Sequence, residues 1–157
     1  MTKIKICGLR REQDIRYANE LMPDYIGFVF LKGKMRYVTF EEAAHLRSLL
    51  DPAIPAVGVF VNEPAENVIR LLQAGTIQIA QLHGQEDEAY IEELRRAGDH
   101  CIIRAFAVRG SEDIHRAFAF PADYPLLDNG KGTGETFDWS LFEKQEKPFF
   151  LAGGLSP

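Results

Sequence analysis

The β-α-β character of the chain is plainest in AVGVFVNEPAENVIRLLQAGTIQIAQL, residues 56–82. Two apolar runs, 56–61 and 77–82, flank a segment whose apolar residues return with helical spacing. Runs that are apolar throughout predict strands buried on both faces, as in a parallel sheet. The stretch therefore predicts a strand, a helix and a second strand. Asn62 is the expected cap of the helix, and Pro64 stands where an early helical position tolerates it.

The same alternation continues along the whole chain. Further apolar runs lie at 4–7, 25–30, 101–108, 124–127 and 149–152. Strands thus recur about every 24 residues, the size of a right-handed βαβ repeat. The segments between them have helical spacing, and the one after Thr39 opens with a capping box completed by Glu42. We expect seven strands and six helices, the last helix carrying Phe137, Leu141 and Phe142.

Two architectures are built from such repeats, the doubly wound open sheet and the (β/α)8 barrel. The first strand ends in Cys7-Gly8-Leu9-Arg10, which is not the glycine-rich fingerprint of a nucleotide-binding open sheet. Polar residues and glycines instead follow many strands, where a barrel assembles its active site. We therefore expect an α/β fold of the TIM-barrel class. Residues 1–157 would form one domain that is C-terminally incomplete, because a barrel has eight strands in about 200 residues or more.

Composition narrows the possible functions. With 46% hydrophobic and 26% charged residues among 157, the chain has material for a core and is not globally disordered. It contains no apolar run long enough to span a membrane. The net charge of −5 argues against nucleic-acid binding. Two cysteines cannot form a disulfide framework and no signal peptide is evident, so we expect a cytoplasmic protein.

Three charged or reactive residues stand at or just after predicted strand ends. Cys7 ends the first strand, where a thiol serves as a nucleophile, a general base or a small buried group. Asp128 follows the sixth, either as a working carboxyl or as the start of an Asx turn. Arg36 lies in a basic loop after the second strand, as a partner for a carboxylate or as part of a solvated charge run.

Glycines and polar residues mark further strand ends. The loop 130–136, which contains Gly132, is suited to close backbone approach to a ligand or to a role as a lid, and it is otherwise a flexible surface loop. Gly153 and Gly154 form an anion-binding nest or a tight turn. Gln81 and His83 alternate along the fourth strand, so both are expected to point into the same space. The four histidines are scattered, and no metal site is expected.

Taken together, these segments resemble the phosphoribosylanthranilate isomerase family over the whole chain. The order and spacing of the motifs carry the resemblance. They are Lys5-Ile6-Cys7-Gly8, Gly27-Phe28-Val29-Phe30, Arg36-Tyr37-Val38, Gly58-Val59-Phe60-Val61-Asn62, Gln81-Leu82-His83-Gly84, Leu127-Asp128, Gly132-Thr133-Gly134, Phe137-Asp138-Trp139 and Leu151-Ala152-Gly153-Gly154-Leu155.

The resemblance implies a (β/α)8 enzyme of tryptophan biosynthesis that works as an intramolecular oxidoreductase of the aldose–ketose type. It implies that Cys7 is the general base and Asp128 the general acid of an Amadori rearrangement. Arg36 would hold the anthranilate carboxylate, and the backbone N–H groups of Gly153 and Gly154 would hold the ribose phosphate.

The same resemblance gives the remaining residues supporting roles. Gln81 and His83 would form the pocket wall, and the loop around Gly132 would fold over the substrate. The partner would be a small phosphorylated molecule, with no cofactor, no nucleic acid and no membrane, and the enzyme would be a monomer or homodimer.

Two other hypotheses stay open at the level of sequence. In the first, the chain is an inactive or association-prone barrel fragment of that enzyme, because a seven-stranded barrel leaves two strand edges unpaired. Alternatively, it is another sugar-phosphate isomerase of the same barrel superfamily, in which Arg36 would have little effect on KM.

Overall fold

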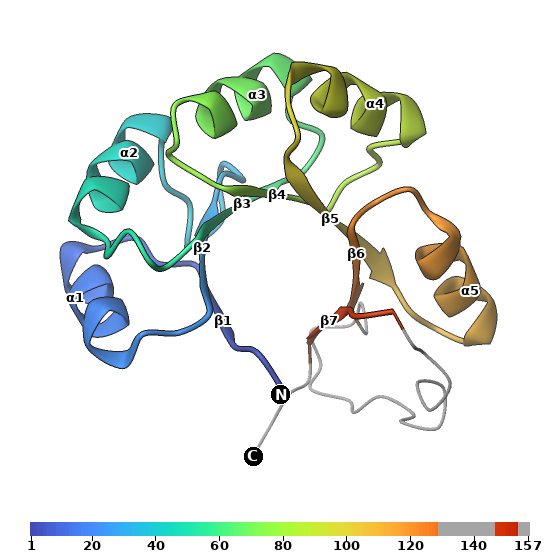
Figure 1. The fold of residues 1–157 in the computed structure, drawn as a ribbon, viewed down its shortest axis with the longest axis horizontal. Coiled ribbons are helices and arrows are strands. Elements are labelled where there is room, and N and C mark those ends of the chain that lie inside the picture. The colour runs from blue at the N-terminus through green and yellow to red at the C-terminus, as the bar shows by residue number, and fades with distance from the viewer. Residues whose placement is uncertain (129–146, 154–157) are drawn as a thin grey trace. The chain divides into compact units, whose positions relative to one another are not determined.

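The computed structural model describes residues 1–128 and 147–153. The chain divides into two compact units, Met1–Cys101 and Ile102–Pro157. Strands and helices alternate in the first unit, and a helix separates the first two strands of the second (Figure 1). Within the part of the chain that is described, every helix is too short or too polar to cross a membrane.

The first unit consists of four parallel strands, each followed by a helix. They are β1 (Lys5–Cys7), α1 (Glu12–Leu21), β2 (Tyr25–Val29), α2 (Phe40–Leu49), β3 (Ala56–Phe60), α3 (Ala65–Gln73), β4 (Ile79–Leu82) and α4 (Glu88–Ala97). The strands pair in chain order, and Figure 1 shows the helices α1 to α4 on one face of them. A doubly wound sheet carries helices on both faces, so this arrangement is that of a barrel.

Strand register divides the side chains of this unit between two faces. Phe30, just after β2, contacts Phe40 of α2 with ring centroids 5.3 Å apart and stacks on Phe60 at 5.0 Å. Side chains at every second strand position, in register with Phe30 and Phe60, therefore face the helices and form the core. The residues at the alternate strand positions, among them Cys7 and Gln81, lie on the other face, because successive side chains alternate along a strand.

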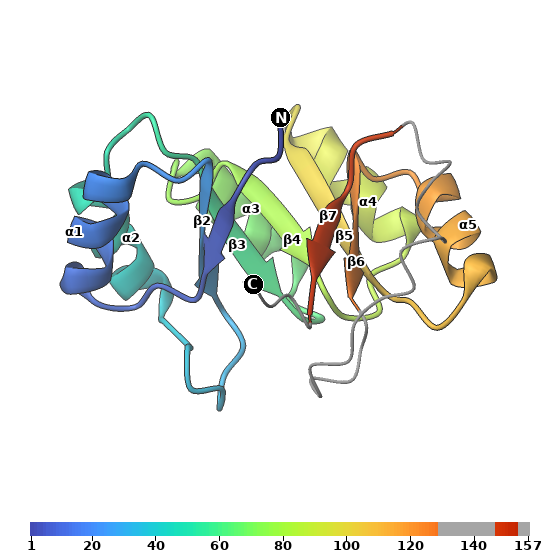
Figure 2. The same cartoon turned by 90° about the horizontal axis from the view of Figure 1, so that it is seen from below.

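The parallel strands of the first unit bring their C-terminal ends to the same edge of the sheet. Figure 2 shows β1, β3 and β4 pointing in the same direction. Cys7 is the last residue of β1, and His83 directly follows β4. Residues 30–39 connect β2 to α2 at this edge, so the basic loop lies among the strand ends where a barrel enzyme carries its active site.

Helix starts agree with the sequence in one case and differ in another. The capping box of α2 is confirmed, because the side chains of Thr39 and Glu42 each accept a hydrogen bond from the other residue's N–H. Asn62 as the cap of α3 is wrong: the N-cap is Pro64. Asn62 has a left-handed backbone with φ of +52°, and its side-chain oxygen accepts the Gln85 N–H at 2.7 Å instead.

The second unit repeats the pattern on a smaller scale. Its elements are β5 (Cys101–Ala107, beginning at the junction), α5 (Ser111–Ala119), β6 (Tyr124–Asp128) and β7 (Phe150–Ala152), with β6 parallel to both β5 and β7. Val108, Ile114, Ala117 and Leu127 form its core. All seven predicted strands are confirmed. The expected helix around Phe137, Leu141 and Phe142 falls outside the described residues.

Candidate active site

A glycine on the neighbouring strand makes room for the Cys7 thiol. Cys7 pairs in register with Gly27 of β2. A Cβ atom on Gly27 would lie 2.8 Å from Cys7 Sγ, a contact that real Cβ atoms do not make. The Gly27 carbonyl accepts hydrogen bonds from the N–H groups of Gly8 and Leu9, at 2.8 and 3.1 Å. The end of β1 is therefore tied to β2, with the half-buried thiol above a strand position that has no side chain.

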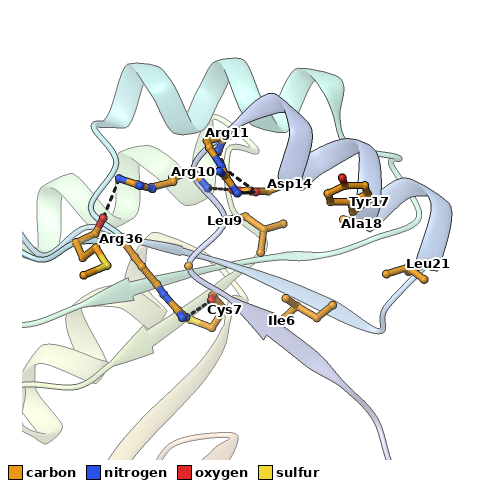
Figure 3. Close-up of a pocket in the computed structure, with 12 residues that line it drawn as sticks. Ile6, Cys7, Leu9, Arg10, Arg11, Asp14, Tyr17, Ala18, Leu21 and Arg36 are labelled. Atoms are coloured by element: carbon orange, nitrogen blue, oxygen red, sulfur yellow. Dashed lines mark hydrogen bonds and ion pairs between the residues drawn. The ribbon is translucent and has the colours of Figure 1, made fainter.

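Arg36 lies beside Cys7, although the loop that carries it follows a different strand. Its Nη1 donates a hydrogen bond to the Cys7 carbonyl at 2.9 Å (Figure 3). Gly8 has a left-handed φ of +89°, and a side chain there would collide with the Arg36 stem. The bridge between Tyr37 and Val29 fixes the end of the loop against β2. The structure thus brings the Arg36 guanidinium to the backbone of Cys7, a residue 29 positions away in the sequence.

A cavity of about 500 Å³ opens next to these two residues. Figure 3 shows Cys7 and Arg36 on one side of it, and Ile6, Ala18 and Leu21 on the side toward α1. Because Ile6 alternates with Cys7 along β1, this cavity lies on the helix side of the strand, whereas the Cys7 side chain is on the opposite face with Gln81.

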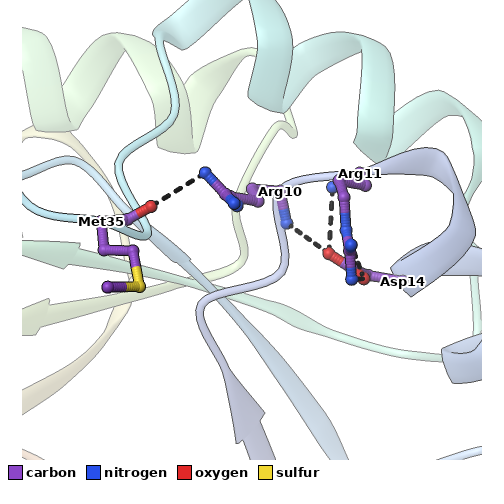
Figure 4. Close-up of polar contacts among 4 residues, drawn as sticks. All are labelled: Arg10, Arg11, Asp14 and Met35. Carbon is purple, nitrogen blue, oxygen red and sulfur yellow. Dashed lines mark hydrogen bonds and ion pairs between the residues drawn. The ribbon is translucent and has the colours of Figure 1, made fainter.

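Two more arginines belong to the rim of this cavity, and each has a partner within the protein. Arg10 Nη1 donates to the Met35 carbonyl at 3.0 Å, which ties the segment before α1 to the Arg36 loop (Figure 4). Arg11 forms an ion pair with Asp14 at 2.7 Å, and the backbone N–H groups of Arg10 and Arg11 also donate to Asp14. The side-chain hydrogen bond from Arg11 lowers the pKa of Asp14, and burial opposes this effect.

Gln81 and His83 meet as their alternation predicts. Gln81 Nε2 lies 3.4 Å from His83 Nδ1, and Gln81 is buried whereas His83 is exposed at the strand end. The Gln81 side-chain oxygen accepts a hydrogen bond from Lys5 Nζ, which reaches it from β1. Gln81, His83, Lys5 and Cys7 therefore belong to one face of the first unit.

Lys5 is a candidate site residue that the sequence reasoning missed. Burial lowers the pKa of its ammonium group, and the charge interaction with Cys7 raises it. A signal was present, because Lys5 precedes Cys7 by two residues and period-two alternation puts both on the same face of a strand. A lysine near a strand start, however, is equally typical of a solvated edge.

In the second unit, Asp128 and Gly153 lie at the ends of neighbouring strands. Asp128 is half-buried, ends β6 and pairs in register with Ala152 of β7. The Asp128 carbonyl accepts the N–H of Val108 at 2.8 Å. Gly153 directly follows β7 with φ of +81°. Asp128 therefore stands next to the start of the predicted phosphate loop.

Three parts of the sequence-based hypothesis are untested by this geometry. Gly132, with the loop 130–136, and Gly154 lie outside the described residues. Cys7 belongs to the first unit and Asp128 to the second, so their placement on opposite sides of one sugar stays a prediction. Among the described residues, no cluster of three or more His, Cys, Asp or Glu side chains could hold a metal ion.

The model of the N-(5'-phosphoribosyl)anthranilate (PRA) isomerase family matches residues 4–157. A relative from Endomicrobium trichonymphae, named N-(5'-phosphoribosyl)anthranilate isomerase, is 45% identical over 161 residues, which cover 99% of this chain and 78% of the relative. A relative of the same name from Thermoanaerobacter pseudethanolicus is 42% identical over 163 residues, with the same two coverages.

Solved structures agree with these sequence matches. Phosphoribosyl anthranilate isomerases from Thermus thermophilus and Thermotoga maritima are 33% and 32% identical, each with a TM-score of 0.85 over 99% of this chain and 78% of theirs. A third structure of this enzyme, in complex with reduced 1-(o-carboxyphenylamino)-1-deoxyribulose 5-phosphate, matches with a TM-score of 0.82 and 32% identity, over 99% of this chain and 77% of that one. The fold class is thus the α/β barrel expected from the polar residues and glycines that follow many of the strands. The chain belongs to the N-(5'-phosphoribosyl)anthranilate isomerase family.

Proposed function

We propose that this chain catalyses the isomerisation of N-(5'-phosphoribosyl)anthranilate to 1-(2-carboxyphenylamino)-1-deoxyribulose 5-phosphate, a step of tryptophan biosynthesis. Its relatives are named for this substrate. The observation that carries the proposal is the contact between Arg36 and the Cys7 carbonyl at the C-terminal end of β1. It places the proposed carboxylate-binding cation next to the residue that carries the proposed general base, in a chain of this family.

The reaction moves protons and needs no external oxidant. The Asp128 carboxyl protonates the ring oxygen of the ribose, the ring opens, and the bond from C1′ to nitrogen becomes a protonated Schiff base. The Cys7 thiolate then removes the proton from C2′, and the electron pair moves toward the nitrogen to give an enolamine. In the ketonisation the C2′ hydroxyl loses its proton and C1′ gains one, which leaves C2′ oxidised to a ketone and C1′ reduced to an amine carbon. Each proton transfer by a positioned group contributes about 10²–10⁴-fold.

Arg36 would bind the carboxylate of the anthranilate group. A guanidinium offers two parallel N–H donors that match a carboxylate. One donor of Arg36 is already held by the Cys7 carbonyl, which fixes the guanidinium at the end of β1. The ligand of the related complex carries both a carboxyphenyl group and a phosphate, which supports this assignment.

The phosphate end of the substrate would be bound by backbone N–H groups of Gly153 and Gly154. Consecutive N–H groups after a strand form an anion-binding nest. The position of Gly153 directly after β7, with a left-handed φ of +81°, supports this role. Gln81 and His83 would form the wall of the pocket, and the loop containing Gly132 would cover the substrate. We expect a monomer or homodimer that binds this small phosphorylated molecule.

Paired substitutions test the two catalytic assignments. Cys7→Ser and Asp128→Asn each keep the size of the side chain and are expected to lower kcat by at least about 10²-fold. Cys101→Ser, at the start of β5, and Asp99→Asn, at an exposed position after α4, are matched controls. Circular dichroism and thermal unfolding check that all four variants fold. Near-normal turnover by the Cys7 or Asp128 variant would remove that residue from its role.

A further inference from the structure

One buried carboxylate joins two loops at the C-terminal ends of β3 and β4. Glu86 has only 5% of its surface exposed. Its Oε1 accepts the N–H of Asn62 at 2.7 Å, and its Oε2 accepts the N–H of Gly84 at 2.8 Å. These two N–H groups belong to different βα loops. Both carboxylate oxygens are thus used to hold the loops together, which offsets the cost of burying the charge.

The two loops are also bound to each other directly. The side-chain oxygen of Asn62 accepts the N–H of Gln85 at 2.7 Å. The N–H of His83 donates to the Phe60 carbonyl at 2.8 Å. A side chain on Gly84 would collide with the Asn62 side-chain oxygen, so the peptide after His83 packs closely against Asn62. The segments 60–62 and 83–86 therefore form one hydrogen-bonded block, with the Glu86 carboxylate at its centre.

This block determines where His83 lies. The His83 side chain is exposed, so packing around its ring constrains it less than it would in the core. Its backbone, by contrast, is held on both sides, at its own N–H by Phe60 and at the next N–H by Glu86. The ring contacts Gln81, which in turn accepts a hydrogen bond from Lys5. A shift of the peptide between His83 and Gly84 would therefore be transmitted to the wall of the site.

We propose that Glu86 is a positioning residue of the isomerase. Its carboxylate holds the peptide between His83 and Gly84 against the β3 loop and so orients His83 toward the substrate, without touching the substrate itself. This inference rests on the proposed function, because it assigns Glu86 a part in binding at the same site.

The test compares two neighbouring acidic residues. Glu86→Gln places an amide NH₂ opposite one of the two backbone N–H groups, so that one donor loses its acceptor. Asp87→Ala removes the N-cap of α4, whose side chain accepts the Tyr90 N–H at 3.0 Å, but leaves the contacts of Glu86 intact. We expect both variants to unfold at lower temperature. Only Glu86→Gln is expected to raise KM, by about tenfold or more, measured well below both melting temperatures.

A second measurement decides the inference without using activity. The NMR signals of the His83 ring, assigned with a His83→Gln variant, are expected to shift in Glu86→Gln and to stay in place in Asp87→Ala. If Glu86→Gln does not fold, Glu86→Asp serves instead, because it keeps the charge but shortens the side chain, so that the carboxylate cannot hold both the Asn62 and the Gly84 N–H groups in their present places. We expect it to shift the same signals by less.

The results separate the inference from the function on which it rests. The role of Glu86 is overturned if its folded variant, Glu86→Gln or Glu86→Asp in its place, leaves the His83 signals as in Asp87→Ala. A KM of Glu86→Gln equal to that of Asp87→Ala also overturns it. If the unmodified protein does not turn over N-(5'-phosphoribosyl)anthranilate, the proposed function fails, and the His83 signals still show whether Glu86 orients that ring.

Discussion

Adding a side chain at Gly27 tests most sharply whether the Cys7 thiol needs its observed position. In Gly27→Ala, the new Cβ would lie 2.8 Å from Cys7 Sγ and 3.2 Å from Cys7 Cα. Ordinary van der Waals contact begins at 3.4 Å, so Sγ and Cβ must separate by at least a further 0.6 Å. Because the Cys7 backbone is also crowded, the strain cannot be relieved by rotating the thiol alone.

The size of the expected effect follows from this displacement. An added methyl group in a packed site costs about 1–3 kcal/mol of stability. Misplacement of a reacting group by about 1 Å can lower the rate by about 10²-fold. A displacement of at least 0.6 Å therefore predicts that Gly27→Ala lowers kcat by about tenfold or more while the protein still folds.

The assay combines steady-state kinetics with thermal unfolding, and the control is a second glycine. Gly110→Ala adds a Cβ that meets nothing within 4 Å, so kcat is expected to stay unchanged. A Gly27→Ala protein that folds and keeps kcat within about twofold of the unmodified enzyme would refute the reasoning, because the thiol would then not need its observed place.

Three further predictions concern residues around the site and at helix starts. Arg36→Ala is expected to raise KM by about tenfold or more, because a charge-assisted hydrogen bond is worth about 1.5–3 kcal/mol. Thr39→Ala removes the α2 cap and is expected to cost about 1 kcal/mol in urea unfolding, with kinetics unchanged. Arg11 lowers the pKa of Asp14 below its ordinary 3.8, so the stability that Asp14 contributes is present above pH 3.8 and lost as the pH falls through the lower folded value. Asp14→Asn is therefore expected to be less stable than the unmodified protein at pH 6, and the difference shrinks at acid pH.

Each of these predictions has an outcome that contradicts it. Arg16→Ala, on the exposed face of α1, is the arginine control. An equal KM for Arg36→Ala and Arg16→Ala would favour the hypothesis that the chain is another sugar-phosphate isomerase, one that does not bind an anthranilate group. Unchanged urea unfolding of Thr39→Ala would show that the capping box does not stabilise α2. If the difference in free energy of unfolding between Asp14→Asn and the unmodified protein is constant from pH 6 to strongly acid pH, the ionisation of Asp14 does not have the role given to it.

The strands could be predicted from the sequence because their signal is local. Each buried strand is a short apolar run, and all seven such runs lie on strands of the structure. The capping box at Thr39 is likewise complete within four consecutive residues. Asn62 was misjudged because its side chain is used by Gln85, which lies 23 residues further along the chain and competes with the helix start for the same oxygen.

The candidate site was only partly predictable, since its contacts depend on register. Cys7 and Gln81 could be identified by their strand positions, but the contact of Arg36 with the Cys7 carbonyl spans 29 residues and depends on how its loop folds back. Glu86 gave no signal, because an acidic residue before a helix is typical of a capping position. Its burial follows from an N–H group 24 residues away, which no local pattern reveals.

The central claim is that Cys7 and Asp128 act on one sugar from opposite sides, the first removing a proton and the second supplying one. A crystal structure of the protein with reduced 1-(o-carboxyphenylamino)-1-deoxyribulose 5-phosphate bound tests it most directly. The account predicts Cys7 Sγ within about 3.5–4 Å of C2′, the Asp128 carboxylate on the far side near the oxygen of the opened ring, and the carboxylate of the ligand on Arg36. A ligand that contacts only one of Cys7 and Asp128, with the other turned away from the sugar, would contradict it.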